Sequence, residues 1–118
     1  MDKTILVGPD IAEGAKFIQA LERSGMRVRG ALWQRNEDAE SWRLEIVTPL
    51  VDEIGLRGTF QKLNQAVNDA SDPVGIDLDW VSPKSPKSDH YKLLRRIFRN
   101  KPMTHPHWLA TSYIYFVR

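Results

Sequence analysis

The sequence contains no cysteine among its 118 residues. Disulfide bridges, thiolate nucleophiles and cysteine-based metal sites are therefore excluded. The chain also has no apolar run near the roughly 18 residues that a membrane-spanning helix needs. Its N-terminus, MDKTILVGPD, shows no apolar stretch of the kind found in secretory signals. We therefore expect a cytoplasmic protein that folds in water and does not enter a membrane.

Acidic residues are almost missing from the last third of the chain. After Val81 the only one is Asp89, against eight Lys and Arg, whereas the earlier part has fourteen Asp and Glu against nine Lys and Arg. The local balances of +7 and −5 make up the formal net charge of +2. Such a division has two interpretations: either the two parts neutralise each other in the fold, or a basic surface binds an anionic partner.

The length is that of one ordinary domain, and we expect residues 1–118 to form a single domain. The 42% hydrophobic and 27% charged residues are typical of a globular protein. Neither LVGPD nor VDEIGLRG has the glycine spacing of a phosphate-binding loop, so no cofactor is expected.

Two amphipathic helices are predicted from apolar residues spaced three and four apart. The first covers about 10–24 and the second about 56–70. Pro9 suits a first helical turn, and Gly25 suits a left-handed helix end. The apolar stripes contain Ile11, Ala15, Ile18 and Leu21 in the first helix, and Leu56, Phe60, Leu63 and Val67 in the second.

Four strands are predicted, at about 26–35, 42–48, 76–81 and 111–117, from alternating or β-branched and aromatic residues. The first two are joined by the polar cluster NEDAES, which indicates an antiparallel hairpin. With a third helix after SPKSPKSD, the order is helix, strand, strand, helix, strand, helix, strand. The expected fold class is α/β (α+β), with a mixed four-stranded sheet and helices packed mainly on one face.

The third helix is expected to begin near Ser88 or Asp89 and to contain the stretch HYKLLRRIFRNK, residues 90–101, which separates apolar from basic side chains. Its inward arc is expected to hold His90, Leu93, Leu94, Ile97 and Phe98, with Tyr91 at the margin. Its outward arc holds Lys92, Arg95, Arg96 and Arg99, and Lys84 and Lys87 precede it in the SPKSPK run. These six basic residues are the first candidate binding site.

The first hypothesis for this arc is an anionic partner, possibly nucleic acid or another polyanion. The alternative is neutralisation within the fold, by acidic residues of the 69–79 region or of the EDAE loop. The SPKSPK run is similar to basic tails that lie along DNA, but Ser-Pro is also common in turns and at helix starts. We interpret it as a turn.

The second candidate site is the sheet face opposite the helices. It is expected to present Trp33 and Arg35, with Tyr113 and Tyr115 from the last strand. Such a face suits base stacking, or an interface with a protein partner or a second copy. Cross-strand pairing of Arg with Asp or Glu would explain its charges equally well.

An enzyme has weaker support in the sequence. Glu45, Asp77 and Asp79 share a predicted sheet face, as a metal-dependent nuclease would require. His105 and His107 lie two apart in a loop containing proline, but no third metal ligand is identifiable. No catalytic residue is assigned, and the sequence predicts a small non-enzymatic binding or accessory module. A protein-interaction module and a nuclease are the alternatives.

Overall fold

The computed structural model describes residues 3–98, 107–109 and 111–118. The strands within these ranges form one sheet in the order β3-β2-β1-β5-β4. β2 and β3 are parallel, and the other neighbours are antiparallel. The elements are α1 (Gly8–Arg23), β1 (Gly30–Asn36), β2 (Ser41–Val47), α2 (Leu50–Asp69), the 3₁₀ turn η1 (Leu78–Trp80), β3 (Val81–Lys84), α3 (Asp89–Ile97), β4 (His107–Leu109) and β5 (Ser112–Val117). The predicted class, the mixed sheet and the order of the seven predicted elements are confirmed.

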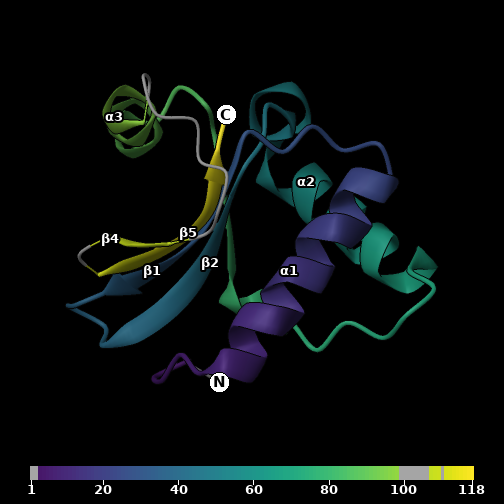
Figure 1. The fold of residues 1–118 in the computed structure, drawn as a ribbon. Coiled ribbons are helices and arrows are strands. Elements are labelled where there is room, and N and C mark those ends of the chain that lie inside the picture. The colour runs from purple at the N-terminus through teal and green to yellow at the C-terminus, as the bar shows by residue number, and fades with distance from the viewer. Residues whose placement is uncertain (1–2, 99–106, 110) are drawn as a thin grey trace.

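The helices lie on both faces of the sheet, two against one. α1 and α2 cover one face and α3 covers the other (Figure 1). The larger core lies under α1 and α2 and includes Phe17, Leu21, Leu44 and Leu63. A smaller core under α3 joins Leu32, Leu94 and Ile114. Because successive strand residues point to opposite faces, β1 contributes Ala31 and Trp33 to the first core and Leu32 to the second.

The helix α1 buries Ile18 and Leu21 of its predicted apolar stripe, but Ala15 is exposed and Phe17 is buried in its place. The helix ends as expected, since Gly25 has a φ of 91° that favours glycine. The backbone of α1 comes close to the sheet at Gly14. A Cβ at this position would overlap the hydroxyl group of Tyr115. Gly14 therefore allows α1 to pack closely over β5, because it has no side chain.

The β1–β2 hairpin is closed by the polar cluster as predicted. The side chain of Asn36 accepts hydrogen bonds from the backbone N–H groups of Asp38 at 3.0 Å and Ala39 at 3.2 Å. Asparagine favours such turns because its side chain replaces a backbone acceptor. The acidic residues of the turn, Glu37, Asp38 and Glu40, are exposed.

The helix α2 begins at Leu50, earlier than predicted, and is kinked where Gly55 has a φ of 74°. Of the predicted stripe, Leu63 is buried, whereas Leu56, just after the kink, is 54% exposed. No helix in the ranges given above is both long enough and apolar enough to cross a membrane.

Two strand predictions need correction. The 76–81 segment is not a strand: Asp77 caps a 3₁₀ turn by accepting a hydrogen bond from the backbone N–H of Asp79 at 2.9 Å, and β3 starts only at Val81. The competing local hydrogen bond of the aspartate explains this outcome. The sheet also has a fifth strand, β4, within the stretch interpreted as a loop.

Candidate functional site

The orientation of α3 is set by two buried side chains. Tyr91 is 3% exposed and Leu94 is 4% exposed. The Tyr91 hydroxyl donates a hydrogen bond to the backbone carbonyl of Arg118, and Ser88 caps the helix by accepting from the Tyr91 N–H. The predicted inward arc is therefore partly wrong. Because the tyrosine is anchored at the end of β5, Leu93 and Ile97 remain about half exposed.

The basic side of α3 faces solvent. Lys92, Arg95 and Arg96 are all exposed. Within the described residues, the cations that form salt bridges are Lys3, Lys16, Arg27, His90 and Arg118, so none of these three takes part in one. The alternative interpretation, neutralisation of this arc by acidic residues of the same chain, is therefore not seen as salt bridges in the described part of the chain. Arg99, the fourth predicted member, lies outside the described residues.

Lys84 and Lys87 lead into the helix and are also exposed. Ser85 forms the turn between them, since its hydroxyl donates to Asp52 at 2.7 Å and accepts from the Lys87 N–H at 3.0 Å. The turn interpretation holds for this second Ser-Pro-Lys, whereas the first lies in strand β3. The structure thus places Lys84, Lys87, Lys92, Arg95 and Arg96 on one continuous stretch, which we call the basic segment.

The predicted open sheet face does not exist at Trp33. This side chain is completely buried under α1, and its indole N–H donates to the Tyr115 hydroxyl at 3.0 Å. The Tyr115 hydroxyl in turn donates to the carbonyl of Ile11 at 2.6 Å. The assignment of Trp33 to a partner surface is therefore wrong. The prediction counted the alternation of faces from Met26 and Val28. Because the strand starts only at Gly30, Trp33 lies on the face opposite to the one expected.

Arg35 is partly exposed near the end of β1. The exposed aromatic residue in the described part of this sheet is Trp108, which the sequence pattern did not indicate. Trp108 on β4 is 54% exposed and meets Trp42 and Tyr113 edge-on, with ring centroids 6.0 Å and 5.0 Å apart. The alternation in β4 was too short to be recognised as a strand.

A buried carboxylate lies between α3 and the sheet. Glu45 on β2 is 8% exposed, and its Oε2 atom has no hydrogen-bond partner among the described residues. The His90 Nε2 atom is 3.7 Å from that oxygen, close enough for an ion pair but too far for a hydrogen bond. Both residues line a pocket of about 110 Å³, with Leu32, Val47, Lys84, Ser88, Tyr91 and Leu94.

Burial raises the pKa of Glu45, and the positive charges of His90 and Lys84 oppose this rise only in part. A carboxyl group with a pKa raised by folding stabilises the fold below its ordinary value near 4.5. That contribution is lost as pH rises through the raised value, because the folded state must then bury a charge.

We therefore expect Glu45→Gln to unfold at a temperature a few degrees above the unmodified protein near pH 8. The difference should disappear near pH 4, where the carboxyl group is protonated in both folded and unfolded chains. Thermal unfolding followed by circular dichroism across this range measures the effect. A glutamine variant that is less stable at high pH would contradict the conclusion that the charge of this buried carboxylate is only partly compensated.

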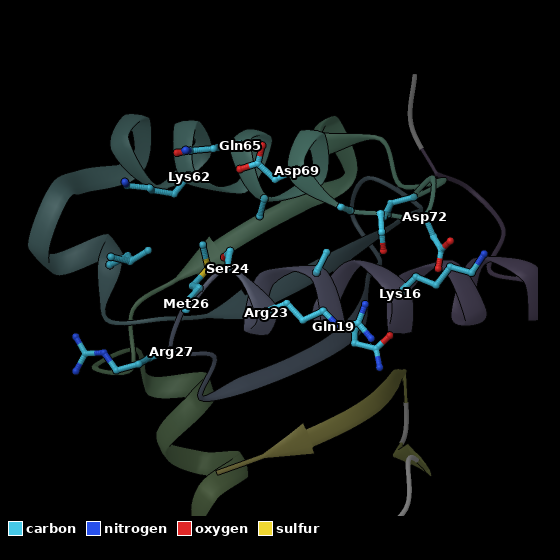
Figure 2. A pocket seen from close by; sticks show the side chains of 17 residues that line it. Lys16, Gln19, Arg23, Ser24, Met26, Arg27, Lys62, Gln65, Asp69 and Asp72 are labelled. Carbon is cyan, nitrogen blue, oxygen red and sulfur yellow. The ribbon is translucent and has the colours of Figure 1, made fainter.

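A larger groove lies on the opposite side of the sheet, between α1 and α2, with a volume of about 750 Å³ (Figure 2). Its charges have mixed sign. Lys16 and Arg23 come from α1, Lys62 and Asp69 from α2, and Asp72 from the following loop. Lys16 also pairs with Glu13 at 3.3 Å. The mixture favours a polyanion less than the basic segment does.

The predicted nuclease site is not assembled. Asp77 and Asp79 lie at the η1 turn and not on a strand beside Glu45. In the part of the chain that the structure describes, no group of three or more His, Asp or Glu side chains is arranged to hold a metal ion. His105 lies outside the described residues, and His107 begins β4.

Comparison of the chain with protein-family models, with curated proteins and with solved structures finds no match.

Proposed function

We propose that the protein binds nucleic acid through the basic segment. The observation that carries this proposal is the exposed, unpaired state of Lys92, Arg95 and Arg96 on a helix whose other side is packed on the sheet. Lys3 and Arg27 lie 2.6 Å from carboxylates, whereas Arg57 and Lys62 also form no salt bridge within the described residues. What distinguishes α3 is that three such cations share one side of a single helix. An external anion could therefore pair with the cations on the basic side of α3.

The spacing of these charges costs stability in the free protein. Lys92 lies three residues before Arg95 and four before Arg96, so the three cations share one side of the helix. Each like-charged pair at this spacing destabilises a helix by a few tenths of a kcal/mol. Phosphate groups would turn this repulsion into attraction, and the two guanidinium groups can each bind a phosphate through two parallel hydrogen bonds.

The helix also holds these side chains on a fixed support. Tyr91 and Leu94 anchor α3 to the sheet, and the hydrogen bond from Tyr91 reaches the last residue of the chain. A helix that is already ordered loses only side-chain freedom on binding, which limits the entropic cost. The basic segment therefore presents its cations without a folding step.

The test is a titration of a fluorescently labelled single-stranded oligonucleotide, read by anisotropy at increasing salt. Binding should be measurable at about 50 mM salt and should fall steeply by about 200 mM, because each neutralised phosphate releases bound counterions. Binding that does not depend on salt, or no binding at low salt, would overturn the proposal. Binding to dextran sulfate without binding to the oligonucleotide would also overturn it.

A further inference from the structure

Glu45 is the buried carboxylate beside the basic segment, whereas Asp52 and Asp89, which also lie near it, are exposed. The carboxylate of Glu45 lies in the pocket beneath α3, beside Lys84 and His90. A negative charge at this place repels phosphate, so it does not serve the electrostatic attraction of a polyanion. A buried acceptor without a hydrogen bond is also unfavourable for the fold. The carboxylate therefore requires a different explanation from the cations around it.

The chemistry of the pocket indicates what it would bind. Leu32, Val47 and Leu94 give it apolar walls, and the unpartnered Oε2 atom of Glu45 is its buried acceptor. A matching ligand group is flat and apolar on its faces and carries an N–H donor at its edge. In an unpaired strand, the amino groups of cytosine, adenine and guanine are such donors. Thymine offers only its imino N–H at N3, which is flanked by two carbonyl oxygens that repel a carboxylate.

The size of the pocket limits how much of the ligand enters. Its volume of about 110 Å³ is small beside the roughly 300–1,000 Å³ of pockets that enclose a whole small molecule. The edge of one base fits this space, but a whole nucleotide does not. Bases in single strands can be turned out of their stack and bound by such an edge.

We propose that Glu45 accepts a hydrogen bond from the amino group of one unstacked base, while the basic segment holds the neighbouring phosphates. This inference rests on the proposed function, because the phosphates must be bound for the base to reach the pocket. Lys84 lines the pocket and belongs to the basic segment, so the two parts of the site are contiguous. The site would then prefer strands of amino-bearing bases to strands of thymine.

The test compares two single-stranded oligonucleotides of equal length, about 15 nucleotides, one of cytosine and one of thymine. They carry the same number of phosphates and differ at the base edge, where cytosine has an amino group and thymine has a carbonyl oxygen beside an imino N–H and carries an additional methyl group. The unmodified protein should bind the cytosine strand at least about fivefold more tightly, at the low end of what a side chain contact to a base edge provides.

The variant Glu45→Gln should lose this preference, giving a ratio near one, because glutamine can also donate to the carbonyl oxygen of thymine. The matched control is Asp89→Asn, which removes an exposed carboxylate of α3 that does not line the pocket. It should keep the preference.

The outcomes separate the two proposals. Equal binding of both strands by the unmodified protein would overturn the role of Glu45 and leave the proposed function standing. A preference that survives in Glu45→Gln would also overturn this role. Failure to bind either strand at low salt would overturn the proposed function itself, and with it the inference.

Discussion

Replacing Lys92, Arg95 and Arg96 together by alanine is expected to weaken binding of a single-stranded oligonucleotide about 100-fold at low salt. Each charged contact to phosphate is taken as about 1 kcal/mol, below the roughly 1.5–3 kcal/mol of hydrogen bonds to charged groups because the side chains are exposed, and about 1.4 kcal/mol is a factor of ten. The fold should persist, because all three side chains are exposed and alanine favours helix. Anisotropy titration measures the affinity, and circular dichroism checks the fold.

The matched control replaces Lys16, Arg23 and Lys62 by alanine. This variant loses the same net charge, but its three positions line the groove between α1 and α2, on the other side of the sheet (Figures 1 and 2). Its affinity should fall only a few-fold, through the weaker overall field. Equal losses in the two variants would mean that net charge governs the binding, and the basic segment would have no special role.

Replacing Trp33 by alanine is expected to destabilise the protein by about 3–5 kcal/mol, the usual cost of removing a large buried aromatic side chain. The indole is completely buried, and its N–H donates to the Tyr115 hydroxyl at 3.0 Å. The variant would lose the packing and leave the Tyr115 hydroxyl with one partner fewer. Urea unfolding followed by circular dichroism measures the loss.

The control for this prediction is Trp108→Ala. Trp108 is 54% exposed at the edge strand β4, so its removal should cost about 1 kcal/mol or less. A comparable cost for the two tryptophans, or a small effect at Trp33, would contradict the placement of Trp33 in the core and restore it as a surface residue.

The local patterns of the sequence were sufficient for most of the helices and strands. The apolar stripe of α1 and the polar turn between β1 and β2 indicate their structures because they depend on neighbours in the chain. The separation of basic from apolar residues in α3 is equally local, and it predicts correctly that Lys92, Arg95 and Arg96 face solvent. The exposed candidate residues could therefore be found without a structure.

The features that were missed depend on contacts between distant parts of the chain. Trp33 is buried because α1 lies over it, and Gly14 allows that approach. Tyr91 faces inward because its hydroxyl reaches Arg118. Glu45 was recognised as a charged residue of a strand, but its burial arises only where α3 crosses β2. The alternation of residues along the strand assigns Glu45 to one face of the sheet, but it does not indicate that α3 covers this face.

The salt dependence of binding, measured in parallel for the unmodified protein and the two triple variants, tests the central claim most directly. Three lost phosphate contacts should reduce the slope of log affinity against log salt by about 2 for a single strand, at roughly 0.7 per contact. The slope should therefore be shallower by this amount in the Lys92, Arg95 and Arg96 variant and unchanged in the groove variant. Identical slopes in all three proteins would contradict binding through the basic side of α3.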